Sequence, residues 1–350
     1  MRVLLTGLIA LVACVALAGC STHRTDLESQ APPQGVEVRS SAELATFADS
    51  LLNSDAAHMD LLSSAALAPL TEAAAIVFRL TGSTDAHALV EQFAGALLRA
   101  RASSGGVSGF FGASSGSVPQ AQATAAAGLA LVEAYAVTRN PTYRDAALAA
   151  AVDVTNPALG WVSSAKEHGV RERPGGPGVN VALTADAALL LKRAAALGDV
   201  GLLAQSRAAL RTVYSSQAAV GRWYAFVGSH QPMDLSEWGT TLFDLLADGS
   251  KESLGIAGGG VPALYDTSFT ARGQLMKNSL TDSQPGGVAL ALRALAAYPD
   301  PGLSETAFAA LVDLRRHDGT ISLARASDTV SQADFALAFA QKAAGPVKGE

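Results

Sequence analysis

The chain has few cysteines, few aromatic residues and few charges. Its two cysteines, Cys14 and Cys20, both lie within the first 20 of 350 residues. The rest of the chain therefore has neither a disulfide nor a thiol nucleophile, even in an oxidising compartment. Charged residues make up only 16% of the chain, the net charge is -6, and no basic cluster occurs. Because nothing is available to neutralise phosphates, we expect no nucleic-acid partner.

Motifs for several kinds of site are also missing. The sequence contains no His-Glu-x-x-His pattern, no cysteine-based metal set and no phosphate-binding Walker loop, and its six histidines are scattered. Residues 112–116 spell Gly-x-Ser-x-Gly, but a helix is predicted before them, whereas the hydrolase motif follows a strand. We therefore predict no metal and no cofactor.

The composition favours an all-α fold. Hydrophobic residues make up 49% of the chain, mostly alanine and leucine, while aromatic residues make up 6%. Alanine and leucine lose little conformational entropy in a helix, and they offer little favourable packing in a pleated sheet. The chain is also too apolar and too regular to remain disordered.

The N-terminus is typical of an export signal, with Arg2 followed by an apolar run over 3–17 and then small residues. Leu17-Ala18-Gly19-Cys20 resembles the lipobox of bacterial lipoproteins, which implies that Cys20 carries acyl chains such as palmitate after cleavage. An ordinary cleaved signal and a short membrane anchor are the alternatives. We expect a signal peptide over 1–19, a lipidated flexible tether over 20–40, and a domain over 41–345 anchored to the cell membrane or outer membrane on its extracytoplasmic side.

The domain is predicted to contain twelve helices in pairs with short connectors. The expected ranges are 42–54, 60–79, 85–101, 120–137, 142–154, 181–197, 200–215, 234–247, 250–256, 286–297, 304–315 and 328–343. Connectors within pairs contain Gly or Pro, at spacings of about 50 to 58 residues, which indicates a helical repeat. The helix over 181–197 is apolar nearly all round, whereas that over 200–215 has one apolar stripe, so the first helix of a pair is predicted to be inner and the second outer.

One hairpin carries a family resemblance. The segment 134–147, with Thr138-Arg139-Asn140-Pro141 at its turn, resembles the commonest hairpin of the (α/α)6 toroid superfamily, in which Gly occupies the position of Arg139. That superfamily includes N-acylglucosamine 2-epimerase-like proteins, glucuronyl epimerases, glycoside hydrolases and polysaccharide lyases. The resemblance implies a closed toroid and a carbohydrate ligand, although one fold hosts many chemistries. An open helical solenoid is the structural alternative, and we favour closure because no capping helix is visible.

Long, glycine-rich loops between the pairs mark the expected site. In a ring of alternating inner and outer helices the loops at 102–119, 155–180, 216–233, 257–285 and 316–327 emerge on one face, where binding groups concentrate. The aromatic candidates for ligand binding are Trp161, Trp223, Tyr224 and Trp238. Alternatively, the tryptophans only fasten the loops to the core.

Ionisable residues in the same loops supply candidates for catalysis by acid and base groups. Asp266 is the first choice because it is predicted in a long loop beside Tyr265, and Glu167 with His168 forms a second candidate set. Arg171 is a candidate for binding an acidic ligand, or else an exposed loop arginine.

Three further acidic residues lie outside this set of catalytic candidates. Asp234 occupies the position of a helix N-cap and Glu237 follows three residues later, as in a capping box, so a structural role is predicted for Asp234. Asp186 stands alone on an apolar inner helix and either faces the central cavity or bonds a neighbouring turn.

The sequence leaves two functions open: a lipoprotein that binds or processes a carbohydrate or cell-envelope glycan, or a non-catalytic envelope scaffold. The oligomeric state does not follow from it.

Overall fold

A computed structural model describes residues 41–56, 62–100, 111–112, 120–164, 167–176, 178–219, 221–271, 276, 285–312 and 329–347. The predicted signal peptide, Cys20 and the tether lie outside these residues, as do most of the loops predicted at 102–119 and 316–327.

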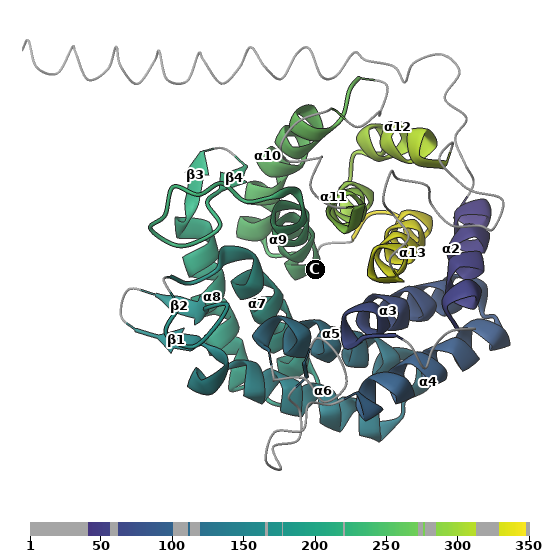
Figure 1. The fold of residues 1–350 in the computed structure, drawn as a ribbon, viewed down its shortest axis with the longest axis horizontal. Helices are drawn as coiled ribbons and strands as arrows, with labels where there is room; N and C mark the ends of the chain where they lie inside the picture. Colours follow the sequence, from purple (N-terminus) through teal and green to yellow (C-terminus); the bar gives the residue numbers. More distant parts are fainter. Residues whose placement is uncertain are drawn as a thin grey trace, which may run out of the picture. The chain divides into compact units, whose positions relative to one another are not determined.

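Twelve α-helices occur in the described residues, and their order follows the predicted pairs (Figure 1). They are α2 (Ser41–Ala56), α3 (Ser64–Thr81), α4 (Thr84–Arg99), α5 (Ala121–Thr138), α6 (Pro141–Val154), α7 (Val181–Ala196), α8 (Leu202–Ser215), α9 (Leu235–Asp248), α10 (Lys251–Ser268), α11 (Pro285–Ala297), α12 (Pro301–Val312) and α13 (Thr329–Ala344).

Six of these helices form a closed inner ring. Around the ring α3 packs on α5, α5 on α7, α7 on α9, α9 on α11 and α11 on α13, and α13 packs on α3 to close it. The other six helices pack outside, with α2 against α13 and α3, and Figure 1 shows the two concentric layers. The predicted (α/α)6 toroid, with the first helix of each pair inside, is therefore confirmed, and an open solenoid is excluded.

Local sequence explains where the helices begin and end. The side chain of Asn140 accepts a hydrogen bond from the backbone N–H of Thr142, and Pro141 opens α6, where its missing N–H costs nothing. At the C-terminal ends of α3 and α9, Gly82 and Gly249 adopt the left-handed conformation that stops a helix. The predicted capping box of Asp234 and Glu237 is present at the start of α9.

Arg139 is the one non-glycine residue with positive φ in the described residues, at 59°, and it occupies the turn position where the related hairpins have glycine. A Cβ atom makes the left-handed conformation costly. We therefore expect Arg139→Gly to stabilise the fold by about 0.5 to 1 kcal/mol, measured by chemical denaturation. Gly82→Ala, at the matching turn after α3, should destabilise it. A loss of stability in Arg139→Gly would show that the interactions of the exposed arginine side chain stabilise the fold by more than its left-handed backbone conformation destabilises it.

The structure corrects the sequence-based boundaries in two places. The ninth helix was predicted at 250–256 with a loop over 257–285, but α10 continues to Ser268 despite Pro262. Two short antiparallel hairpins occur in predicted loops, formed by β1 (Trp161–Ser163) with β2 (His168–Val170), and by β3 (Gln217–Ala219) with β4 (Arg222–Trp223). Residues Pro157–Leu159 form a short 3-10 helix before β1.

The core lies between the two helical layers and consists largely of alanine and leucine. Leu131 of α5 and Leu190 of α7 are fully buried, each worth about 1.5 to 3 kcal/mol on transfer from water. Among the described helices α3 alone has the length and apolar composition of a membrane span, but 72% of that window is buried inside the ring. A helix covered in this way is typical of a protein core.

Candidate functional site

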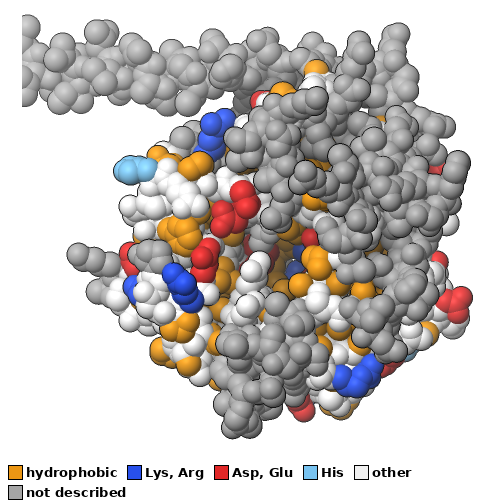
Figure 2. All heavy atoms as spheres, in the orientation of Figure 1, with side chains coloured by type: hydrophobic (Ala, Val, Ile, Leu, Met, Phe, Trp, Pro, Cys, Tyr) orange, Lys and Arg blue, Asp and Glu red, His pale blue; other side chains and the backbone are white. Residues whose placement is uncertain are grey.

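The axis of the ring contains a cavity of about 460 Å³ that all six inner helices line. Figure 2 shows a hollow near the middle of the ring, in which hydrophobic, acidic and basic atoms are visible. The ionisable residues that line the cavity are Glu72, Asp186, Asp244, Arg293 and Asp334.

This cavity opens toward the N-terminal ends of the inner helices. Its rim includes Ser64, Gln122, Ser236, Pro285 and Val330, which lie in the first turns of α3, α5, α9, α11 and α13. Every long connector runs from the end of an outer helix to the start of an inner one, so the long loops enter the ring at this end. The site was predicted on this face.

Two aspartates from neighbouring helices meet in the cavity wall. Asp186 of α7 and Asp244 of α9 share a hydrogen bond between their carboxyl groups, with Asp244 as the donor. Asp244 is only 3% exposed, and its Oδ2 atom has no hydrogen-bond partner. Two ionised carboxylates cannot make such a contact without strong repulsion, so the pair retains a proton.

The surroundings of the pair raise the pKa values of both carboxyl groups and so favour their protonated forms. Burial raises the pKa of Asp186 to about 6, although the hydrogen bond from Asp244 and the charge of Arg293 act in the opposite direction. Burial, the charge of Asp186 and the shared hydrogen bond together raise the pKa of Asp244 well above its usual value. A pair of carboxyl groups with pKa values pushed apart is the arrangement that supplies an acid and a base in one site.

Arg293 crosses the axis beneath this pair. Its Nη2 atom donates to Oε2 of Glu72 at 2.5 Å, and the two side chains are only 13% and 8% exposed. The guanidinium lies 3.6 Å from the centre of the Phe243 ring, so the arginine is held between a carboxylate and an aromatic face. This geometry fixes a positive charge close to Asp186 and Asp244.

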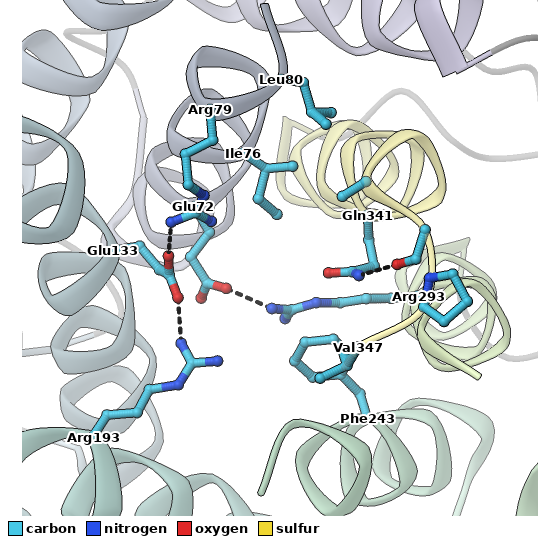
Figure 3. Close-up of a pocket in the computed structure, with 13 residues that line it drawn as sticks. Glu72, Ile76, Arg79, Leu80, Glu133, Arg193, Phe243, Arg293, Gln341 and Val347 are labelled. Carbon is cyan, nitrogen blue, oxygen red and sulfur yellow. Dashed lines mark hydrogen bonds and ion pairs between the residues drawn. The ribbon is translucent and has the colours of Figure 1, made fainter. Parts of the chain in front are cut away.

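A second cavity, of about 280 Å³, lies at the C-terminal ends of the inner helices and shares Glu72, Phe243 and Arg293 with the first. Figure 3 shows Glu133 between Arg79 and Arg193 in this cavity, with both ion pairs at 2.5 Å. Burial alone would raise the pKa of Glu133, but the charges of Arg193 and Arg79 hold it below its usual value. The smaller cavity therefore contains two separate sets of ion pairs, and the pair of Glu72 and Arg293 also lines the larger cavity.

The aromatic side chains predicted to bind ligand are not among the residues that line the larger cavity. Trp223 and Trp238 are buried and donate their indole N–H groups to the backbone oxygens of Val213 and Gly221. Trp161 packs in the core from β1, and Tyr224 makes an edge-to-face contact with His230. The positions of the tryptophans agree with the alternative that they fasten the loops to the core.

The hairpin of β1 and β2 lies away from the residues that line the axial cavity, and it positions Glu167, His168 and Arg171 in or next to β2. The backbone of Glu167 bonds to Ser164 across the hairpin turn, and the ring of His168 contacts the hydroxyl of Ser163 at 3.2 Å. His168 lines a separate, open cavity beside α8. The backbone N–H of Arg171 donates to Gly160, and its buried Nε atom has no partner.

The prediction that Asp266 lies in a loop is wrong. It lies near the C-terminal end of the outer helix α10, where it is exposed and outside the residues that line the axial cavity. The segment 257–285 was predicted as one of the long, glycine-rich loops between helix pairs, and it includes three consecutive glycines at 258–260. In the structure these glycines lie within α10, and Gly260 allows close packing against Gly221 and Leu242.

Sequence analysis identified only one of the five ionisable residues that line the larger cavity, Asp186. The signal for the others was present, because Glu72, Asp244, Arg293 and Asp334 are each isolated charges within an apolar stretch of an inner helix. A charge at such a position faces either a cavity or a partner. No cluster of three or more His, Cys, Asp or Glu side chains suited to a metal ion occurs in the part of the chain that the structure describes.

Comparisons with solved structures reveal the same fold. The chain resembles a glycosyl hydrolase family 88 protein from Bacteroides vulgatus, with a TM-score of 0.65 and 12% identity over 87% of this chain and 99% of that one. It also resembles the GH76A alpha-1,6-mannanase of Salegentibacter sp. HEL1_6, with a TM-score of 0.65 and 13% identity over 86% and 99% of the two chains. A third similar structure is a GH76 alpha-mannanase from Bacteroides thetaiotaomicron, with a TM-score of 0.65 and 14% identity over 89% of this chain and 98% of that one.

The neighbours share the (α/α)6 toroid with this chain. A variant of the Salegentibacter mannanase in which two consecutive aspartates are changed to asparagine is described as inactive, and its structure contains alpha-1,6-mannotriose. No protein-family model and no curated protein matches the sequence of this chain.

Proposed function

We propose that this protein is a lipid-anchored, extracytoplasmic enzyme that cleaves a carbohydrate or cell-envelope glycan in the larger axial cavity by acid and base catalysis. The observation that carries the proposal is the proton-sharing pair of Asp186 and Asp244 in the wall of that cavity. Glycan cleavage in such cavities needs one carboxyl group to hold a proton and another to be ionised. The carbohydrate substrate class is inferred from the fold shared with glycoside hydrolases and a polysaccharide lyase.

The proposed reaction assigns the proton of the pair to the leaving group. Asp244 protonates the oxygen of the glycosidic bond as the bond to the anomeric carbon breaks, and water attacks that carbon from the other side. The proton of the water passes to a carboxylate on another helix of the wall, and Asp334 of α13 is the candidate because it lines the same cavity. Neighbouring helices pack about 8 to 10 Å apart, so opposite helices of a six-membered ring leave room for a sugar between their side chains.

This assignment differs from that of the mannanase with the same fold. The inactive mannanase variant has two consecutive aspartates replaced. This chain contains no two consecutive aspartates, so it has no matching adjacent pair. In this chain two helices bring distant aspartates together instead. We therefore expect a different substrate or a different arrangement of acid and base, and we do not assign mannan to this protein.

A panel of plant, fungal and bacterial polysaccharides tests the proposal directly. The purified protein should release reducing ends or unsaturated products from at least one of them, detected by a reducing-sugar assay and by mass spectrometry. Absence of products from every polysaccharide, combined with tight binding of one of them, would support the second candidate, a non-catalytic envelope scaffold. That candidate is favoured by one observation: Phe243 is the only aromatic residue among the described residues that line the cavity, and Arg293 covers its ring.

The proposed location depends on Cys20 and has its own test. Cys20→Ser should move the protein from the membrane fraction to the soluble extracytoplasmic fraction, because the acyl chains have no other attachment point in the predicted lipobox. Metabolic labelling with a radioactive fatty acid should mark the wild type and not the variant. Labelling that persists in Cys20→Ser would contradict the lipid assignment.

A further inference from the structure

The larger cavity has an uneven charge. Four of the five ionisable residues that line it carry carboxyl groups, and Arg293 is its one basic residue in the described part of the chain. That arginine is already bound to Glu72 at 2.5 Å. The other arginines of the axis, Arg79 and Arg193, line only the smaller cavity at the opposite end. The two cavities therefore differ in charge: Asp186, Asp244 and Asp334 line only the larger one. Three guanidinium groups lie around the smaller one, together with Glu72 and Glu133 (Figure 3).

Helix dipoles do not remove this asymmetry. The N-terminal ends of the inner helices do favour negative charge, but their effect falls off within the first turn. Asp186 is the sixth residue of α7, and Asp244 is the tenth residue of α9. The carboxyl groups therefore lie beyond the reach of the helix ends and present their charge to whatever occupies the cavity.

Asp244 also has a hydrogen-bonding capacity that the protein leaves unused. The side chain is 3% exposed, lines the cavity, and has an Oδ2 atom without a partner. Buried polar atoms in folded proteins nearly always have a partner, so one without a partner in a cavity wall calls for a donor from a ligand. An ammonium group offers three donors and a positive charge, and can donate to Oδ2 of Asp244 and to the carboxylate of Asp186 while the pair keeps its shared proton.

We propose that the larger cavity binds a glycan containing a sugar with a free amino group, a hexosamine without its N-acetyl substituent, with the ammonium group at Asp186 and Asp244, and that it rejects uronate-containing glycans. The proposal rests on the proposed function, because it names the substrate class of the same cavity. A volume of about 460 Å³ is in the range of small-molecule sites and suits a few sugar units at most. Carboxylates of uronates would face the carboxyl groups of the wall at close range, which is unfavourable.

Binding of matched oligosaccharides tests this substrate class. Isothermal titration of the full chain in detergent should give at least 10-fold tighter binding for a glucosamine trimer than for the N-acetylglucosamine trimer of the same length. An oligogalacturonate of equal length should give no measurable binding.

Variants separate a site effect from general attraction to an acidic protein. Asp244→Asn should remove at least 10-fold of the affinity for the glucosamine trimer, and thermal unfolding verifies that the variant is folded. Asp199→Asn, at the exposed connector between α7 and α8, removes the same charge elsewhere and should leave binding unchanged. Unchanged binding in Asp244→Asn, or equal loss in both variants, would overturn the proposed subsite.

The remaining outcomes distinguish the substrate class from the function itself. Equal or tighter binding of the acetylated trimer or of mannotriose, lost in Asp186→Asn, would overturn the amino-sugar proposal and leave a glycan-processing cavity in place. Failure of every oligosaccharide to bind, together with no product from any polysaccharide, would overturn both.

Discussion

Asp186→Asn is expected to lower the turnover of any glycan that the protein cleaves by about 10²- to 10⁴-fold, the usual contribution of a positioned acid or base group. Asparagine has the shape of the aspartate and its amide oxygen can still accept a hydrogen bond, but it lacks the negative charge that helps to raise the pKa of Asp244. Asp244 then gives up the proton that it must deliver to the leaving group more readily. Because Asp186 lines the cavity and is not a core packing residue, the variant should remain folded. The measurement is the initial rate of product release at saturating glycan, with circular dichroism to verify the fold.

Two other aspartates serve as comparisons for this prediction. Asp199→Asn removes an exposed carboxylate at a short connector on the side away from the cavity mouth and should retain full turnover. Asp266→Asn tests the sequence-based candidate on α10. Full turnover in Asp186→Asn with loss in Asp266→Asn would contradict the cavity assignment and place the chemistry at the end of α10.

Arg293→Met is expected to destabilise the fold by about 3 to 5 kcal/mol, the cost of removing one partner from a buried ion pair. The variant leaves the carboxylate of Glu72, 8% exposed, without its cation, and removes the guanidinium that lies over Phe243. Asp186 and Asp244 lose a nearby positive charge as well, which raises the cost of ionising either of them. Chemical denaturation with a two-state analysis gives the change in free energy of unfolding.

A double variant and a surface variant control for lost packing. Glu72→Leu combined with Arg293→Met removes both charges, and the protein should recover most of the lost stability because no uncompensated charge remains. Arg144→Met breaks an exposed pair with Asp145 at 2.8 Å and should leave the stability unchanged. A double variant no more stable than Arg293→Met alone would show that packing, not charge, accounts for the loss.

The sequence was sufficient to predict the architecture because local signals and periodicity agree along most of the chain. Asn140-Pro141 marks a turn that begins α6, and the capping box of Asp234 and Glu237 begins α9. Such signals are local, so they can be recognised without knowledge of tertiary contacts. The end of α10 was missed for the opposite reason: glycines weaken a helix locally, and the packing of Gly260 against Gly221 and Leu242 is a tertiary contact that the local sequence does not reveal.

The site was predicted less well, because a cavity is built from residues far apart in the sequence. Asp186 was noticed as an isolated carboxyl group, but nothing local indicates that Asp244, 58 residues later, lies beside it. The tryptophans attracted attention by residue type, and only the structure reveals that the indole groups of Trp223 and Trp238 bond to the backbone. The face of the ring was predictable from loop lengths, whereas the pairing of side chains across helices was not.

The raised pKa values also determine how the pair affects stability. The folded protein binds more protons than the unfolded chain between the ordinary aspartate pKa of 3.8 and about 6, because burial raises the pKa of Asp186 to about 6. The pair therefore favours folding at low pH, and this contribution is lost as the pH rises through that window. At neutral pH the buried pair therefore lowers the stability of the fold, as functional sites often do.

The most direct test of the account is a pH titration of the aspartate carboxyl groups by ¹³C nuclear magnetic resonance. The pair should titrate in two steps, one with an apparent pKa of about 6 and one well above the usual aspartate range, and both steps should disappear in the double variant Asp186→Asn and Asp244→Asn. If every aspartate carboxyl group is instead ionised with a midpoint at or below the ordinary value of 3.8, the pair holds no proton and the cavity lacks its acid.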